Sequence, residues 1–282
     1  MKAQILLATH NPDMELFARQ LASLVAQTEP DWQCLVFDDS SNDRLAVRDS
    51  LPDERFHLLP ATEHLGPFRA FGALLSAAGP VPAFLCDQDD HWHPEKLSRM
   101  LEIDGPVFSA MRVVDPAGSV VRPRFLPPPT DLSAAGLLLM NCVPGTALKI
   151  TDEVRRAGLP LPAPGLRGWH DQWLAAVAAR VGSLIYLDEP LVDYTQHSEQ
   201  VIGDGLRRIS AQRLRRFIGQ PQLRSRARWV MSAAFRLLQL PGPDDPDLQA
   251  VAAGDFRQVL GRYDLPPQRA ALLTVGRLLP GR

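Results

Sequence analysis

The sequence predicts an α/β protein with a mostly parallel central sheet flanked by helices, followed by a helical C-terminal extension. Over the first hundred residues, short apolar runs alternate with segments of helical periodicity, which is the pattern of strands joined by helical crossovers. After about residue 204, arginine-rich amphipathic segments replace this alternation. The chain has 282 residues, of which 45% are hydrophobic, so it can form a large core; this excludes wholesale disorder and a coiled coil.

Each element of the first hundred residues follows from a local pattern. Expected strands are apolar runs of about five residues, and expected helices repeat apolar side chains on one face, as Phe17, Leu21 and Leu24 do. In chain order we expect strand 4–8, helix 13–26, strands 33–37 and 55–59, helix 68–78, strand 81–86 and helix 94–101, which has a proline in its first turn.

The spacing of the cysteines and the N-terminal residues predict the cellular compartment of the protein. Three cysteines are widely spaced with no CxxC pair, which is typical of small core residues in a reducing compartment. The N-terminus runs directly into the first expected strand, which leaves no room for a signal peptide, and no apolar stretch reaches the length of a membrane span. We therefore expect a cytoplasmic protein.

Carboxylates follow two of the expected strands. Strand 33–37 is followed by Asp38 and Asp39, and strand 81–86 is followed by Asp87, Asp89 and Asp90. Ligands of such sheets bind beyond the carboxyl ends of the strands, so these acids should share one edge. Two carboxylates about 4 Å apart repel by about 4 kcal/mol at an effective dielectric near 20, which favours a bound cation. All-oxygen ligands favour Mg²⁺ or Mn²⁺, which also binds substrate phosphates, so the edge predicts a nucleotide-diphosphate site.

Each motif also has a purely structural interpretation. Asp90 precedes helix 94–101 and could cap it, and the run 38–41 could be a turn whose side chains bind their own backbone. Either motif alone leaves both interpretations open. Their occurrence at two strand ends of one sheet favours a site.

The ordered motifs of residues 3–203 resemble the family 2 glycosyltransferases, which have the GT-A fold, and most closely the rhamnosyltransferase-like branch. The resemblance rests on LLATHN (6–11), QLASLVAQT (20–28), VFDDSS (36–41), CDQDDHWHPEKL (86–97), GWHDQW (168–173) and YLDEPLVDY (186–194) with Gln196 and His197. Three positions depart from the usual pattern: His10 replaces Tyr, Ala70 replaces Asn, and His170 replaces Glu. None of these changes removes a carboxylate that the mechanism needs.

The resemblance implies a role for each matched residue. Asp171 is the expected general base, and Asp89, with Asp87, is the expected metal ligand, with His197 as a further ligand or diphosphate contact; an ordinary loop histidine is the alternative. The implied nucleotide-sugar-binding residues are Ala8, Thr9, Asn11, Asp39, Arg69, Asp87, Asp89 and Asp90, of which Asp39 reads the pyrimidine base; Arg69 has surface solvation as its alternative. The implied cofactor is Mg²⁺ or Mn²⁺.

Asp171 illustrates what the sequence leaves open. It begins a segment with Trp173, Leu174 and Val177 at helical spacing, so it could equally be an N-cap or a first-turn acid. The helix dipole would lower its pKa, whereas burial beside Trp169 and Trp173 would raise it towards the value a base needs. The sequence does not decide between them.

The resemblance implies an inverting glycosyltransferase that moves a sugar from dTDP-rhamnose or a UDP-sugar to a hydroxyl of a saccharide or lipid-linked saccharide in bacterial surface polysaccharide or glycolipid synthesis. The alternatives are a metal-dependent nucleotidyltransferase, for which the first strand lacks the expected glycine-rich basic loop, and a non-catalytic nucleotide-sugar-binding member. We divide the chain into a GT-A domain, 1–204, with a nucleotide-binding half (1–104) and an acceptor-binding half (105–204), and a basic helical region, 205–282.

Charge separates these two regions. Residues 1–204 carry 16 lysines and arginines against 27 acids, whereas residues 205–282 carry 14 arginines against five aspartates. Segments 206–218 and 224–240 interleave arginines with apolar residues, which suits peripheral contact with the inner face of the plasma membrane. A helical cap on the catalytic body, a dimer contact or a solvated face are the alternatives; we favour a packed helical subdomain with one basic face, and we expect no nucleic-acid binding.

Overall fold

The computed structural model describes residues 1–61, 63–162, 169–196, 221–256, 259 and 262–263. Its centre is a nine-stranded sheet. Strand β1 (Ala3–Thr9) pairs in parallel with β2 (Trp32–Asp38) and β4 (Ala83–Cys86), and β2 pairs in parallel with β3 (Phe56–Leu59). These four strands confirm the expected parallel sheet, and their carboxyl ends lie at one edge.

The sheet continues beyond β4 with mixed directions. Its strand order is β3-β2-β1-β4-β8-β6-β9-β5, with β8 (Leu148–Ile150), β6 (Val107–Val114), β9 (Ile185–Thr195) and β5 (His91–Trp92). Strand β8 is antiparallel to both neighbours, β6 and β9 are parallel, and β7 (Val120–Arg122) pairs with β6 outside this order. The segments of the two proposed halves, 1–104 and 105–204, therefore contribute to a single sheet.

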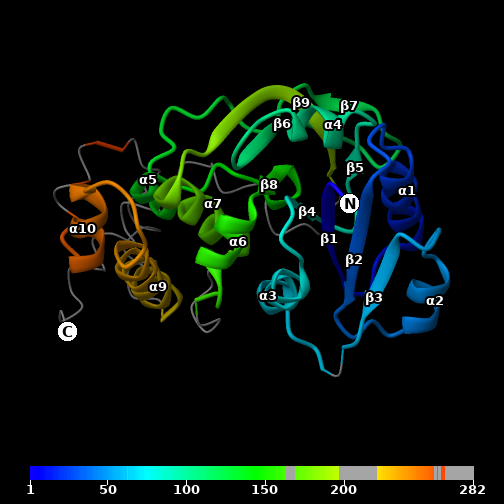
Figure 1. The fold of residues 1–282 in the computed structure, drawn as a ribbon, viewed down its shortest axis with the longest axis horizontal. Coiled ribbons are helices and arrows are strands. Elements are labelled where there is room, and N and C mark those ends of the chain that lie inside the picture. Colours follow the sequence, from blue (N-terminus) through cyan, green and yellow to red (C-terminus); the bar gives the residue numbers. More distant parts are fainter. Residues whose placement is uncertain (62, 163–168, 197–220, 257–258, 260–261, 264–282) are drawn as a thin grey trace, which may run out of the picture.

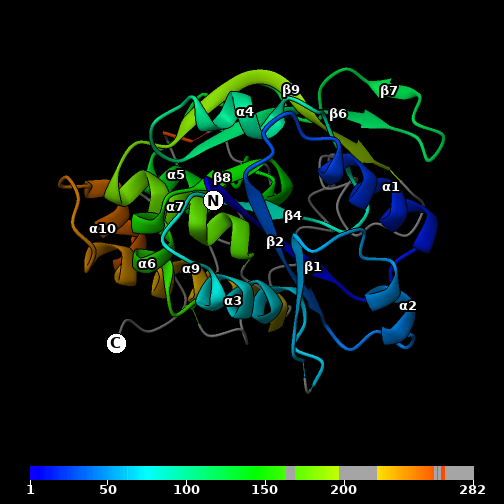
Figure 2. The same cartoon turned by 45° about the vertical axis from the view of Figure 1, so that its right-hand side comes forward.

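Successive side chains of a strand point to opposite faces of the sheet. Apolar side chains lie on both faces here, and helices cover both. In β1, Ile5 and Leu7 join one apolar cluster with α1 (Met14–Val25), α2 (Arg44–Asp49) and α4 (Lys96–Leu101). Leu6 joins the opposite cluster with α3 (Pro67–Ala77), α5 (Ala134–Leu139), α6 (Asp152–Gly158) and α7 (His170–Val181). Figures 1 and 2 show α1 and α2 on one side of β1 and β2, and α3 on the other.

Local signals explain where these helices begin. Asp13 caps α1 by accepting hydrogen bonds from Glu15 N and Leu16 N, which satisfies two amides of the first turn. The expected helix at 94–101 is shorter than predicted: α4 begins at Lys96, after Pro94, and has no side-chain cap. Asp90 therefore does not cap this helix.

The described part of the C-terminal region packs on the body, as we favoured. Helix α9 (Pro221–Leu238) and α10 (Pro246–Ala253) lie side by side, and α9 contacts α5 and α7 (Figure 1). Trp229, Val230 and Leu237 are buried, whereas Phe235 faces solvent and Arg228 is exposed. Segment 206–218 lies outside the described residues. No described helix is both long enough and apolar enough to cross a membrane.

Arg180 of α7 fastens the two C-terminal helices to the body. Its guanidinium donates to the main-chain carbonyls of Leu237, Pro243 and Leu240 around the α9–α10 turn. Only 7% of this residue is exposed. A buried arginine whose three nitrogens each donate to a carbonyl oxygen specifies one docking geometry for the turn.

Candidate active site

The carboxyl end of β2 places Asp39 in a fixed, buried position. Its two carboxylate oxygens accept hydrogen bonds from the main-chain amides of Leu65 (2.5 Å) and Gly66 (2.7 Å), and it is 3% exposed. Gly66 has φ 75°, a left-handed conformation that glycine adopts without strain, directly before α3. Asp38 forms the expected turn, because its Oδ1 accepts from Ser41 N at 3.1 Å. The structure therefore gives Asp38 a structural contact and leaves Asp39 for the site.

The end of β1 lies beside both acidic loops. Thr9 Oγ1 and His10 N donate to Gln88 Oε1 at 2.9 and 2.8 Å, which fastens this loop to the one that follows β4. Asn11 N donates to Ser41 Oγ, and this hydrogen bond links the end of β1 to the loop that follows β2. Ala8 is half-buried one residue earlier. The predicted residues Ala8, Thr9 and Asn11 therefore lie between the two acidic loops.

The loop after β4 holds three acids close together. Burial, with the charges of Asp89 and Asp171, raises the pKa of Asp87 from 3.8 to about 7. Burial and the charges of Asp87 and Asp89 raise the pKa of Asp90 well above its ordinary value. Asp90 is 2% exposed; the Thr146 hydroxyl favours its charged form, but no hydrogen bond of normal geometry reaches either carboxylate oxygen from the described residues. Such a carboxylate is costly unless a cation or a bound donor compensates it.

Lys96 is the buried lysine beneath this loop. Its Nζ donates to the carbonyl oxygen of Thr146 at 2.6 Å and lies 3.0 Å from the centre of the Trp92 ring. Burial lowers its pKa well below the ordinary value, while Asp90 and Asp87 oppose this effect. Lys96 thus joins the acidic loop to the segment before β8.

Asp171 stands in the first turn of α7, whose N-cap residue is Trp169. Its Oδ1 accepts from Gln172 N at 2.6 Å, and its Oδ2 accepts from Asn141 Nδ2 at 3.2 Å. Burial nevertheless raises its pKa from 3.8 to about 6, against these hydrogen bonds and Arg226. Burial therefore outweighs the stabilisation of the charged form. Trp173 turns away to donate to Gly158 O, and Trp169 is 42% exposed.

His170 and Gly145 shape the surroundings of Asp171. The His170 ring stacks on Phe71 of α3 with centroids 3.8 Å apart, and burial lowers its pKa to about 3, so it stays neutral. A Cβ on Gly145 would lie 3.2 Å from His170 Nε2 and 3.4 Å from Asp171 Cβ. The absence of a side chain at Gly145 therefore lets this segment pass close to the start of α7.

A small cavity, partly open to solvent, lies in the part of the sheet formed by residues 105–204. Residues of β6, β9, segment 125–127 and the segment that precedes β8 line it. The lining includes Phe108, Met111, Phe125, Cys142, Pro144 and Tyr186. Cys142 directly follows Asn141, which binds Asp171, so the cavity and Asp171 share one loop. Ser109, also in the lining, buries a hydroxyl that has no partner among the described residues.

The acidic loop fits a divalent cation by its donors. Asp87, Asp89 and Asp90 offer only oxygen ligands, and the two carboxylate oxygens of Asp90 are buried. Among the described residues, three potential ligand atoms come within 4.8 Å of one another only at His10, Asp39 and His64, so the three acids of this loop do not form a closed cage. A cation held by one or two carboxylates, with substrate phosphates completing its shell, is the binding mode typical of Mg²⁺.

The remaining predicted residues have mixed outcomes. Arg69 is exposed in the first turn of α3, just after the amides that bind Asp39. His197 lies outside the described residues. Gln88, His64, Lys96 and Asn141 were missed by the sequence analysis as site residues. Gln88 stands within the acidic run and could have been noticed there, whereas the other three carry no local signal.

Three comparisons place the chain among known proteins. The family model "Glycosyl transferase family 2" matches residues 5–104. An uncharacterized glycosyltransferase of Nostoc sp. is 29% identical over 214 residues, which cover 70% of this chain and 65% of that protein. TuaG of Bacillus subtilis, whose name assigns it to teichuronic acid biosynthesis, is 38% identical over 86 residues, or 28% of this chain and 33% of TuaG. The chain therefore spans less than two thirds of either relative.

Solved structures share the fold at low sequence identity. Staphylococcus aureus TarS 1–349 in complex with UDP-GlcNAc matches with a TM-score of 0.58 and 14% identity, over 98% of this chain and 90% of that one. Mannosyltransferase PcManGT from Pyrobaculum calidifontis in complex with GDP-Man and Mn²⁺ matches with a TM-score of 0.54 and 17% identity, over 99% and 76% of the two chains. The likeness confirms the GT-A fold.

Proposed function

We propose that this chain, whose residues 5–104 match the family 2 glycosyltransferases and which has the GT-A fold, is an inverting glycosyltransferase of that family with a pyrimidine nucleotide-sugar as donor. dTDP-rhamnose or a UDP-sugar is the donor, and the acceptor is a hydroxyl of a saccharide or lipid-linked saccharide in surface polysaccharide or glycolipid synthesis. One observation carries the proposal: the charges of both Asp89 and Asp171 act on Asp87, so the donor-side acids and the candidate base share one site.

The donor would bind across the ends of β1, β2 and β4. Asp39, held by two main-chain amides, would accept a hydrogen bond from the ring N–H of the pyrimidine. Thr9 and Asn11 lie between the two acidic loops, and Arg69 at the start of α3 would meet the base or the phosphates. Asp89 and Asp87 would hold Mg²⁺ or Mn²⁺, which as a Lewis acid would stabilise negative charge on the diphosphate.

Asp171 would accept the proton of the acceptor hydroxyl. With a pKa of about 6 it is mostly ionised at neutral pH and still basic enough to act as a general base. Asn141 and the Gln172 amide fix its two oxygens, and the neighbouring cavity offers aromatic surface for a sugar ring. The hydroxyl oxygen forms the new bond to the anomeric carbon while the bond to the diphosphate oxygen breaks, so the nucleoside diphosphate leaves with the electron pair and the anomeric carbon inverts.

The proposal is tested in two steps on the full chain. Thermal shift with UDP, dTDP, UDP-sugars and dTDP-rhamnose, each with and without Mn²⁺, should identify a nucleotide that stabilises the protein only when the metal is present. Asp171→Asn should then lower turnover by orders of magnitude while the nucleotide-induced shift persists. Asp49→Asn, at the exposed end of α2, is the matched control and should leave both unchanged. Full turnover by Asp171→Asn would exclude the assigned base.

The two alternative functions make different predictions. A nucleotidyltransferase would release pyrophosphate from a nucleoside triphosphate, yet the β1–α1 loop, Thr9-His10-Asn11-Pro12-Asp13, has neither the glycines nor the basic residues that bind a triphosphate. A non-catalytic member would bind the donor and never consume it. Incubating the donor with acceptor saccharides and assaying for free nucleoside diphosphate separates these cases.

A further inference from the structure

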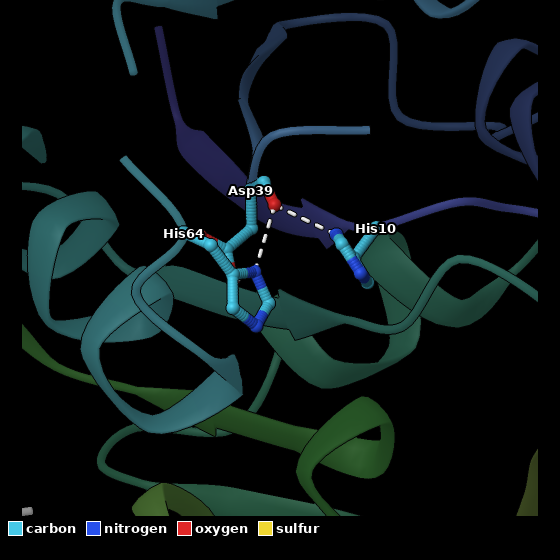
Figure 3. A group of neighbouring side chains, drawn as sticks. All are labelled: His10, Asp39 and His64. Carbon is cyan, nitrogen blue, oxygen red and sulfur yellow. Dashed lines mark hydrogen bonds and ion pairs between the residues drawn. The ribbon is translucent and has the colours of Figure 1, made fainter. Parts of the chain in front are cut away.

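A second group of side chains that can ligate a metal lies at the carboxyl ends of β1 and β2, beside the all-oxygen loop but sharing no residue with it. His10 follows β1, Asp39 follows β2, and His64 precedes α3, so three separate loops contribute (Figure 3). His10 Nδ1 lies 2.7 Å from the main-chain oxygen of Asp39, and His64 Nδ1 lies 3.1 Å from both that oxygen and Asp39 Oδ2. One ligand atom from each of the three residues falls within 4.8 Å of the others.

The surrounding structure holds the carboxylate and leaves the imidazoles accessible. Asp39 is nearly fully buried, and the Leu65 and Gly66 amides fix the direction of its carboxylate. Hydrogen bonds to a ligating carboxylate are a common feature of metal sites because they orient it. His64 and His10 are exposed, and their rings stand 4.4 Å apart at 40°. An ion can therefore reach the group from solvent.

The hydrogen bonds define which ring nitrogens of the two histidines carry protons. A carbonyl oxygen only accepts, so both Nδ1 atoms carry protons that point at Asp39. His10 Nε2 then accepts from Asn11 Nδ2 at 3.1 Å. An ion bound at Nδ1 would shift the proton of each neutral ring to Nε2, so His10 would exchange its contact with Asn11 for one with water.

We propose that His10, Asp39 and His64 form a second cation site, which binds Zn²⁺ or a similar nitrogen-preferring ion and excludes the nucleotide when it is occupied. Two imidazoles and one carboxylate are a ligand set that Zn²⁺ accepts, with positions left for water. The acidic loop offers oxygen alone and suits Mg²⁺ or Mn²⁺. The two neighbouring sites, joined by the hydrogen bond of His10 N to Gln88, thus separate ions by donor type.

The exclusion of nucleotide rests on the proposed function, in which Asp39 binds the pyrimidine ring. An ion drawn between the two imidazoles and Asp39 occupies the carboxylate oxygen and the space that the ring needs. Zinc would therefore compete with the nucleotide, whereas Mn²⁺ at the acidic loop would support nucleotide binding. The same protein would respond in opposite ways to two divalent ions.

Zinc binding alone is measured first, by titration calorimetry of the full chain and by the absorption spectrum of bound Co²⁺, with no nucleotide present. His64→Ala and His10→Ala should each weaken binding at least tenfold and abolish the Co²⁺ bands. Two controls should leave both readouts unchanged: His57→Ala, an exposed histidine of β3, and Asp89→Asn in the acidic loop. Asn11→Asp should strengthen binding, because a carboxylate accepts from the Nε2–H that bound His10 presents. Zinc affinity that survives His64→Ala, or that is lost in Asp89→Asn, would overturn the site.

Competition is measured second, as the thermal shift that UDP or dTDP produces with Mn²⁺ in the presence of increasing Zn²⁺. Zinc should abolish the nucleotide shift in the natural chain but not in His64→Ala. A shift that persists at saturating Zn²⁺ would overturn the exclusion. If no nucleotide shifts the protein under any condition, the proposed function fails, while the zinc titration still decides the site.

Discussion

The pH dependence of turnover is the sharpest test of Asp171. Burial raises its pKa from 3.8 to about 6 even though Asn141, the Gln172 amide and Arg226 all favour the charged form. If the rate follows the ionised fraction, turnover at pH 5 should be about one tenth of that at pH 7, because each unit below the pKa lowers the base form about tenfold. If Asp171 had the ordinary pKa of an aspartate, turnover would fall by only about 5–10% between pH 7 and pH 5.

The assay is the initial rate of nucleoside diphosphate release between pH 5 and pH 8, with donor, acceptor and Mn²⁺ all saturating. Asp87 has a pKa raised to about 7 and could produce a similar acid limb. Asn141→Ala separates the two, because Asn141 donates to Asp171, and its other hydrogen bond is to the amide of Val143. Loss of a hydrogen bond worth about 1 kcal/mol should move the midpoint up by roughly 0.7 pH units.

Gln239→Ala is the matched control, since it removes an exposed amide beyond the end of α9 and should leave the midpoint in place. A rate that stays constant from pH 7 to pH 5 would refute the reasoning about burial. A midpoint near 6 that does not move in Asn141→Ala would assign the limb to another group.

Three further predictions concern the stability of the fold and the site. Folding raises the pKa of Asp87, so the contribution of this group to stability is full below about pH 4 and is lost as pH rises through about 7. The metal-free protein should therefore have a lower melting temperature at pH 8 than at pH 5 when measured by calorimetry. Asp87→Asn should reduce this difference in melting temperature. Arg180→Met leaves three carbonyl oxygens of the α9–α10 turn without their donor and should cost about 2–4 kcal/mol in urea unfolding, whereas Arg228→Met on the exposed face of α9 should cost less than about 0.5 kcal/mol. Lys96→Met leaves the buried Thr146 carbonyl without its donor and should destabilise the protein by about 1–3 kcal/mol in urea unfolding, and equal stability of this variant would show that this hydrogen bond makes no net contribution.

Local patterns of the first hundred residues were sufficient to predict most of that part of the fold. The runs that became β1, β2 and β4 are continuously apolar because both faces of the parallel sheet are covered, and the stripe of Phe17, Leu21 and Leu24 is the face that α1 packs on it. The start of α4 was placed two residues early because proline at 94 also suits the turn before a helix. The mixed half of the sheet was not predicted, since the short strand β8 and the bulged strand β9 pair with residues distant in sequence.

The same division holds for the site. The sequence by itself determined which acids follow β2 and β4, because the position of a strand end is a local property, and it determined the family that these motifs resemble. Only the tertiary structure decided that burial outweighs hydrogen bonding at Asp171, that Lys96 lies under the acidic loop, and that His64 reaches Asp39. Desolvation and pairing depend on which distant segments cover a side chain, and no local pattern encodes that.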